Sequence, residues 1–425
     1  MLRRNVTRGA IAVVSTLLLS SLLVGCGSSG KSGASGATTT TAGKPSGPVR
    51  GFDGTTITVA SLGIKGQLPA NEWGVKARIE RFNSTNEIPG VKLNYTEFAD
   101  DKLDPATALS EARRLVTEEK VFGLVGDLSA NNPAEYFAQQ KVPYFGYAFD
   151  NTYCSNKPTK DLWGFGFTGC LVPDNPSALP DNFGLLYDYA KQKLGKDKPT
   201  VAFFSSDNQS GRNTAKFGQA ELVGAGFDVK LAKGILPPPP ISDYTPYAQQ
   251  VLTADGGKAP DVIVCFAAVD CIPMYKQVVA NHYQGIFFHT LWSDALIKAM
   301  NGSVVGVQWA NPTDSSPAVD QMKADLKAVN PDQAVDIGVI AGYFSTSMFI
   351  DALKIVAKKG KGAITPQAVR DAASTMTFKL EGLVGPTTYP AATVKSPGCS
   401  SLMIDDGTQW KTITPFTCSS RSFTP

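Results

Sequence analysis

The feature that most constrains the fold of this chain is a regular alternation of short, β-branched apolar runs with amphipathic helical segments. Residues 57–63 are rich in strand formers, residues 72–83 have helical spacing, and residues 91–98 alternate as a half-buried strand does. Asp104 and Pro105 then begin a helix, because aspartate caps a helix N-terminus and proline already has the φ of the first helical position. This alternation of strands and helices predicts a parallel sheet covered by helices on both faces.

The alternation occurs twice. It pauses over residues 151–180, begins again at Thr200, and continues to about residue 290, after which residues 305–312 lead back toward the first series. Two series predict an α/β protein of two Rossmann-like lobes, joined by several crossing segments, with a ligand cleft at the carboxyl ends of the strands. We expect lobe 1 to comprise residues 52–167 and 311–384. We expect lobe 2 to comprise residues 168–310 and 385–425.

The N-terminus combines a basic start with an apolar run over residues 10–24 that ends at Cys26. The run is short for a spanning helix, which needs about 20 apolar residues. Its end, Leu-Val-Gly-Cys, resembles the lipobox of bacterial lipoproteins, in which the signal peptide is cut before the cysteine and the thiol carries a diacylglycerol. An ordinary secretory signal with an accidental cysteine, or an uncleaved anchor, is the alternative. We expect a signal peptide over residues 1–25 and membrane attachment through a lipid on Cys26.

Residues 26–51 are almost all Gly, Ser, Thr, Ala and Pro, so they have too little apolar surface to offset the entropy of ordering and predict a flexible tether. The rest of the chain is long enough for two hydrophobic cores. A formal net charge of +3, spread along the chain, gives no basic stripe. Nucleic acid is therefore excluded as an expected partner.

Six cysteines remain beyond Cys26, and an even number in an exported protein favours disulfides. Proximity in sequence suggests the pairs Cys154–Cys170, Cys265–Cys271 and Cys399–Cys418. Metal binding is the alternative, but the chain has no CxxC pair and two histidines, so we expect no metal site. The chain has no GxSxG elbow, so the sequence gives no catalytic residue to propose, and we expect no cofactor.

Residues 100–131 and 141–151 resemble the first lobe of type I periplasmic solute-binding proteins, and among them the branched-chain amino acid-binding (leucine/isoleucine/valine) group of ABC importers. The resemblance covers nearly all of the chain after the tether, and the Asp-Pro helix followed by a short strand is its most specific part. It implies a monomeric clamp in the bacterial cell envelope, on the outer face of the cytoplasmic membrane or in the periplasm. Such a clamp closes on one small solute and delivers it to an ABC permease that a separate ATPase drives.

The resemblance also implies which loops bind the solute. In the family, the loop after the third strand offers hydroxyl and amide donors to the ligand carboxylate; here it contains Ser129, Ala130 and Asn131, with alanine at the usual hydroxyl position. The next loop contains Phe149 and Asp150, and an acid there would repel a carboxylate.

In the second lobe, the family's aromatic residue before a glycine aligns with Ser210, and its acid for the α-ammonium group aligns with Asp270. A bond between Cys265 and Cys271 would hold Asp270 rigidly, which reduces the entropy lost on binding. Trp292, Tyr343 and Trp73 are further candidates for the walls of the cleft, since aromatic rings supply much of a pocket's apolar area.

Each candidate also has a structural explanation that the sequence leaves open. Ser129 and Asn131 suit helix capping, Asp150 suits a cap or a local salt bridge, and Asp270 suits the N-terminus of the following helix. The three aromatic candidates and Phe149 suit core packing.

We therefore expect a lipid-anchored extracytoplasmic solute-binding protein that captures an amino acid or a related compound for an ABC importer. A ligand-sensing receptor head that is not coupled to transport is the alternative from another class. A hydrolase on the same scaffold is a third hypothesis, which no nucleophile motif supports.

Overall fold

The computed structural model describes residues 48–173, 178–238 and 240–424. The expected signal peptide, Cys26 and most of the expected tether lie outside the described residues. Arg50, at the end of the expected tether, donates hydrogen bonds to the carbonyl oxygens of Val121, Gln140 and Lys141 at 2.8, 2.6 and 3.0 Å. The chain therefore contacts the first lobe before residue 52.

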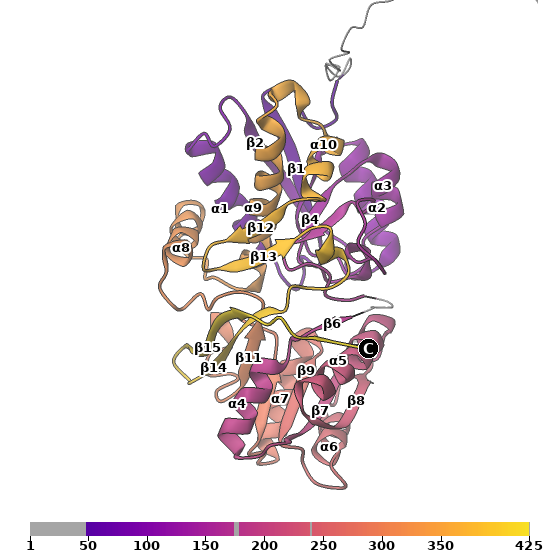
Figure 1. Cartoon of the computed structure of the whole chain (residues 1–425), viewed down its shortest axis with the longest axis vertical. Coiled ribbons are helices and arrows are strands. Elements are labelled where there is room, and N and C mark those ends of the chain that lie inside the picture. The colour runs from indigo at the N-terminus through magenta and orange to yellow at the C-terminus, as the bar shows by residue number, and fades with distance from the viewer. Residues whose placement is uncertain (1–47, 174–177, 239, 425) are drawn as a thin grey trace, which may run out of the picture. The chain divides into compact units, whose positions relative to one another are not determined.

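The first sheet has five parallel strands in the order β2-β1-β3-β4-β5. Figure 1 labels β2, β1 and β4 of this sheet. In chain order its strands are β1 (Thr56–Gly63), β2 (Lys92–Asp100), β3 (Gly123–Asp127), β4 (Tyr144–Gly146) and β5 (Gly164–Gly166). The helices of this lobe are α1 (Asn71–Ser84), α2 (Pro105–Thr117), α3 (Ala134–Gln140), α8 (Pro317–Val329), α9 (Ile337–Ala357) and α10 (Pro366–Ala373). One hydrophobic cluster joins the sheet to α1 and α9, and a second joins its other face to α2 and α3. The predicted cap is present: Asp104 accepts the Thr107 amide at 2.7 Å and Pro105 begins α2.

The second sheet has seven strands in the order β15-β14-β11-β10-β9-β7-β8. In chain order they are β7 (Thr200–Ser206), β8 (Asp228–Leu236), β9 (Val262–Phe266), β10 (Ile286–His289), β11 (Val304–Val307), β14 (Cys399–Asp405) and β15 (Trp410–Cys418). Helices α4 (Gly184–Leu194) and α5 (Gln209–Ala225) pack on one face, and α6 (Thr245–Leu252) and α7 (Cys271–Ala280) pack on the other. Strands β7 to β11 are parallel, whereas β14 and β15 are antiparallel additions at one edge.

The two sheets share one topology. The order β8-β7-β9-β10-β11 repeats β2-β1-β3-β4-β5. In each sheet the order in which successive strands are added therefore reverses between two neighbouring strands, β1 and β3 in the first sheet and β7 and β9 in the second. Ligands of open α/β sheets bind beyond the carboxyl ends of strands at such switch points. The relevant loops therefore follow β1 and β3 in the first sheet, and β7 and β9 in the second.

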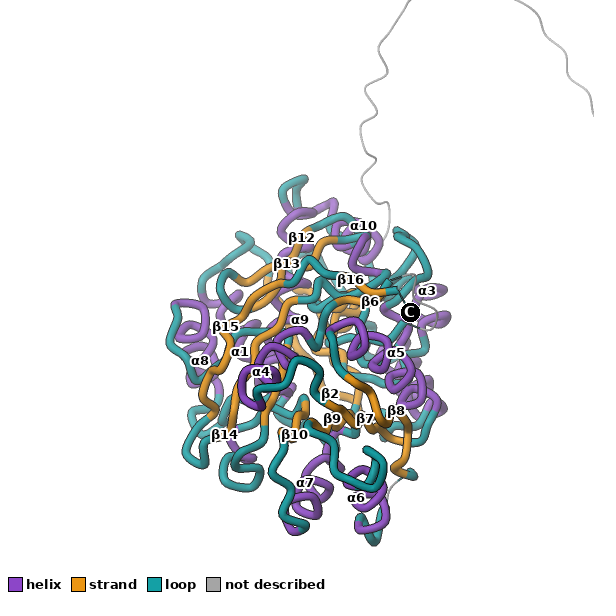
Figure 2. Tube along the Cα trace, turned by 60° about the horizontal axis from the view of Figure 1, so that its bottom comes forward, coloured by secondary structure: helices purple, strands orange, loops and turns teal. Residues whose placement is uncertain are grey.

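In the described part of the chain, three crossing segments connect the lobes: the first between β5 and α4, the second between β11 and α8, and the third between β13 (Val384–Thr388) and β14. The hairpin of β12 (Thr377–Leu380) and β13 leads into β14. Strand β16 (Ser422–Phe423) pairs with β6 (Leu179–Pro180) just before α4 (Figure 2). Arg421 binds the carboxylate of Asp181 at 2.6 Å and holds this C-terminal segment beside the first crossing.

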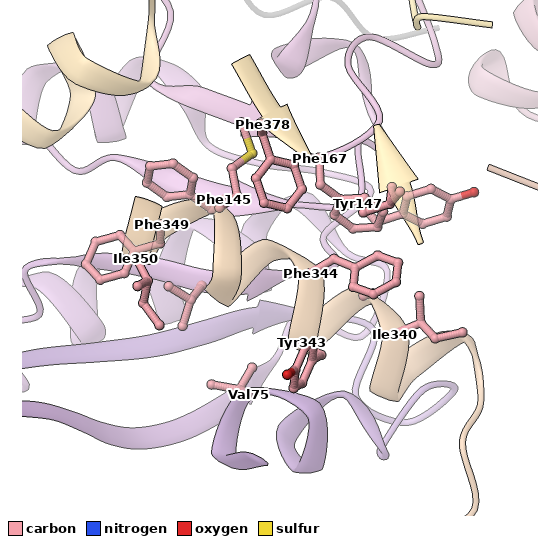
Figure 3. Close-up of a cluster of buried hydrophobic side chains, with 14 of the residues drawn as sticks. Val75, Phe145, Tyr147, Phe167, Ile340, Tyr343, Phe344, Phe349, Ile350 and Phe378 are labelled. Carbon is pink, nitrogen blue, oxygen red and sulfur yellow. The ribbon is translucent and has the colours of Figure 1, made fainter. Parts of the chain in front are cut away.

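Helix α9 is the one helix in the described part of the chain that is long and apolar enough to cross a membrane. Most of it is buried within the protein, as in the central helix of a soluble core. Figure 3 shows Phe344 and Phe349 of this helix among aromatic side chains such as Phe145 and Phe167. Its burial explains why most of its residues are apolar.

The α/β fold with two lobes is confirmed, with differences in detail. Helix α4 and the antiparallel strands β14 and β15 were not predicted from the sequence. Residues 305–312 were expected to be a crossing, but Val304–Val307 form β11. The three disulfides join Cys154 to Cys170, Cys265 to Cys271 and Cys399 to Cys418, as proximity suggested.

Candidate functional site

The loop after β3 is held by its own side chains. The Ser129 hydroxyl donates to Asp101 Oδ2 at 2.6 Å and accepts the Asn131 amide at 3.0 Å. Asp127 Oδ1 accepts the Ser129 amide at 2.9 Å. Ser129 is fully buried, whereas Ala130 and Asn131 are partly exposed. The hydroxyl of Ser129 is therefore used within the loop.

Asp150 connects this loop to the one after β4. Its Oδ1 accepts the Thr152 amide at 2.9 Å, which caps the short helix Asn151–Tyr153, and its Oδ2 accepts the Asn132 amide at 2.8 Å. Burial raises the pKa of Asp150, and burial likewise raises the pKa values of Asp101 and Asp127. The carboxyl of Asp150 thus has structural partners, and its contact with a solute stays a prediction.

Aromatic side chains follow Gly146 at the end of β4. Phe149 is partly exposed and meets Tyr147 edge-on at 4.8 Å between ring centroids. Tyr147 is buried, stacks on Phe167 at 5.3 Å, and donates its hydroxyl to Gln308 Oε1 at 2.5 Å. Because Gln308 follows β11, this hydrogen bond joins the carboxyl ends of the two sheets.

The second lobe places Ser210 and Asp270 on different helices. Ser210 is exposed in the first turn of α5, which Asn208 caps through the Gly211 amide at 2.7 Å. Asp270 precedes α7, directly before Cys271, but its side chain makes no capping hydrogen bond. Its Oδ1 instead accepts the Tyr244 hydroxyl at 2.6 Å, and burial together with this bond raises the pKa of Tyr244 to about 12.

The three aromatic candidates are in contact with other elements. Trp292 is 1% exposed, and its indole N–H has no partner in the part of the chain that the structure describes. The Tyr343 hydroxyl donates to Asp325 at 2.6 Å, and Figure 3 shows this side chain directed toward Val75 of α1 rather than toward Phe167. Trp73 is partly exposed under the ammonium group of Lys76. A role for any of them in solute binding stays a prediction.

The structure reveals a pocket that the sequence analysis missed. We call it the hinge pocket, because residues where the three crossing segments join the second lobe line its wall. Its defining residues are Asn182, Phe183, Phe266, Phe288, Gln308 and Ser400. Gln308 is a strongly polar side chain directly after the apolar strand β11. Residues so far apart in sequence meet only through the fold.

The described residues give little support to a metal site, a reactive histidine or a dinucleotide site. No group of three or more His, Cys, Asp or Glu side chains in that part of the chain is arranged to hold a metal ion. Burial lowers the pKa of His289 to about 3, and its ring bonds Ser303 and the Leu291 amide, so this histidine is neutral and structural. Gly164, Gly166 and Gly169 have the spacing of a dinucleotide fingerprint. They lie in and just after β5, and no helix begins there, so the required strand–turn–helix context is missing.

Comparisons with known proteins agree with this architecture. The structure is similar to a possible leucine/isoleucine/valine-binding protein from Rhodopirellula baltica, at 15% identity and a TM-score of 0.67, over 87% of this chain and 98% of that one. It is similar to an ABC transporter solute-binding protein from R. palustris in complex with 4-hydroxybenzoate, at 18% identity and a TM-score of 0.64, over 87% and 97%. A branched-chain amino acid ABC transporter protein from Thermus thermophilus with bound valine matches at 12% identity and a TM-score of 0.66, over 86% and 97%.

A search of curated proteins finds no match. A family model of periplasmic binding proteins matches residues 64–401, which is most of the chain. The family consists of substrate-binding proteins rather than enzymes. This chain belongs to the periplasmic binding protein family.

Proposed function

We propose that this protein captures a small organic solute between its two lobes and delivers it to an ABC permease that a separate ATPase drives. The observation that carries the proposal is the strand order that both sheets share, because it gives each lobe a set of switch-point loops at the carboxyl ends of its strands. The hydrogen bond between Tyr147 and Gln308 joins the carboxyl ends of the two sheets. Rotation about the three crossing segments would separate these ends, admit a solute and close on it. Family membership supports the same reading.

An amino acid or a related compound is the first solute class to test. Asp270 would bind an ammonium group, since its carboxylate is partly exposed at the end of β9 and is oriented by Tyr244. The loop containing Ser129, Ala130 and Asn131 would contribute through the Ala130 amide, because the Ser129 hydroxyl and the amides of Ser129 and Asn131 are already bonded within the protein. The similar structures are named for amino acids and for an aromatic acid, so they do not identify the solute of this protein.

The proposal includes attachment to the membrane through a diacylglycerol on Cys26, with a tether that lets a monomeric head reach the permease. Replacing Cys26 by serine should move the protein from the membrane fraction to the soluble fraction without changing the melting temperature of the head. Retention of Cys26→Ser in the membrane fraction would contradict lipid anchoring at this residue.

The decisive experiment pairs a thermal-shift screen of residues 48–425 with uptake measurements in a deletion strain. A solute at 100 times its Kd stabilises the folded state by about 2.7 kcal/mol, enough to raise the melting temperature by several degrees. We expect the stabilising solute to be the one whose uptake is lost on deletion. Unchanged uptake together with a lost transcriptional response would refute transport and favour the receptor alternative.

A further inference from the structure

The hinge pocket lies on the face of the second sheet that α4 covers, at the carboxyl ends of its strands. Phe183 lies at the end of the first crossing segment, Gln308 at the start of the second, and Ser400 in β14, directly after the third, while Phe266 and Phe288 come from β9 and β10. A change in the angle between the lobes therefore alters the walls of this pocket. The pocket is narrow in the present conformation, so entry of a ring is expected to accompany movement of the crossing segments.

The pocket has an aromatic floor that extends across neighbouring strands. Phe266 stacks on Phe203 at 5.1 Å and on Phe288 at 6.5 Å, with interplanar angles of 29° and 23°. Phe183 meets both Phe266 and Phe288 edge-on at 6.0 Å. Phe183 and Phe288 are almost fully buried, whereas Phe266 remains partly exposed in the pocket. An additional ring can extend this stack, because aromatic rings prefer offset-stacked or edge-to-face contacts.

The polar part of the pocket carries no charged side chain. Asn182 donates its Nδ2 to Glu221 Oε2 at 2.9 Å, and its Oδ1 is buried without a partner in the described part of the chain. Burial raises the pKa of Glu221 to about 8, so this neighbour is largely neutral near pH 7. A buried acceptor without a donor is costly, and a guest hydroxyl would satisfy it.

We infer that the hinge pocket binds the hydroxylated aromatic ring of the solute, with the ring on Phe266 and the hydroxyl donating to Asn182. The inference rests on the proposed function and names the solute class of that site. Charged ring substituents are disfavoured, because the lining offers no counter-charge. The rest of the solute would extend toward Tyr147, whose hydroxyl bonds the pocket residue Gln308.

The test measures binding of three uncharged probes by titration calorimetry: 4-hydroxybenzamide, benzamide and cyclohexanecarboxamide. We expect 4-hydroxybenzamide to bind at least about tenfold more tightly than benzamide, and benzamide to bind more tightly than the cyclohexane compound. Phe266→Leu should weaken binding of 4-hydroxybenzamide about tenfold, and Asn182→Leu should remove its advantage over benzamide. The matched control is Phe227→Leu, since Phe227 contacts Tyr187 in the same lobe and does not line the pocket.

Equal affinities for the three probes, or an equal loss in Phe266→Leu and Phe227→Leu, would overturn the inference. Binding of leucine or valine by a protein that ignores 4-hydroxybenzamide would overturn it while leaving the proposed function intact. If none of these compounds binds, the inference is overturned too. Uptake in the deletion strain would then decide the proposed function separately. Melting curves of each variant show whether a loss of binding reflects a loss of folding.

Discussion

The hydrogen bond between Tyr147 and Gln308 gives the sharpest test of how the lobes close. Tyr147 is 7% exposed and its hydroxyl lies 2.5 Å from Gln308 Oε1, whereas Gln308 is partly exposed. Such a bond contributes about 0.5–1.5 kcal/mol net. Water can replace part of the lost bond at Gln308, so Tyr147→Phe should cost about 1 kcal/mol. If opening breaks this bond, the closed state loses that amount and solute affinity falls about fivefold.

Calorimetric titration with the solute found in the screen measures this loss, and a double-mutant cycle with Gln308→Leu isolates the pair. The matched control is Tyr389→Phe, because the buried Tyr389 hydroxyl donates to the Gly166 carbonyl at 2.8 Å without involving the second sheet. Tyr389→Phe should lower stability and leave affinity unchanged. Unchanged affinity in Tyr147→Phe, or an equal loss in the control, would refute the reasoning.

Four further predictions address the site and the fold. Asp270→Ala should weaken binding of an ammonium-bearing solute at least about tenfold, or about 1.4 kcal/mol, and unchanged affinity in a folded variant would remove Asp270 from the site. Tyr343→Phe should lower the free energy of unfolding by about 2 kcal/mol in urea, because its hydroxyl bonds the carboxylate of Asp325; a loss of affinity without a loss of stability would instead place Tyr343 in the solute site. Glu221 keeps its proton in the folded state up to a pKa of about 8, while the unfolded chain releases it near 4.5, so wild-type stability should fall relative to Glu221→Gln as pH rises between these values; a pH-independent difference would contradict burial of the carboxyl. Alkylation of denatured, unreduced protein from an oxidising compartment should modify none of the six cysteines beyond Cys26, and six modified thiols would exclude the disulfides.

Most of the fold could be predicted because its signals are local. The period of the apolar residues identified β1, α1 and α2 to within about two residues, and the cap at Asp104 marked where α2 begins. The helix α4 and the edge strands β14 and β15 were missed. Helix α4 begins soon after an irregular crossing and has no side-chain cap, and the edge strands join a parallel sheet late in the chain in the antiparallel sense.

The site was less predictable, because the role of a polar side chain depends on its partners. The sequence placed Ser129, Asp150 and Asp270 after strands, and switch-point topology explains why such loops are candidates. It could not reveal that Ser129 bonds Asp101, that Asp150 holds the Asn132 amide, or that Asp270 pairs with Tyr244 rather than capping α7. These partners lie on other elements.

The sequence by itself determined the α/β class, the duplication into two lobes and the family resemblance, and it suggested the pairing of nearby cysteines, because each depends on periodicity or on short separations along the chain. Only the tertiary structure decided which side chains are used within the protein and which remain open to a solute. The hinge pocket illustrates the difference: Asn182, Gln308 and Ser400 lie where three separate crossings join the second lobe, and they meet at one end of the second sheet. No local pattern encodes such a meeting, since it follows from the packing of both lobes around their connections.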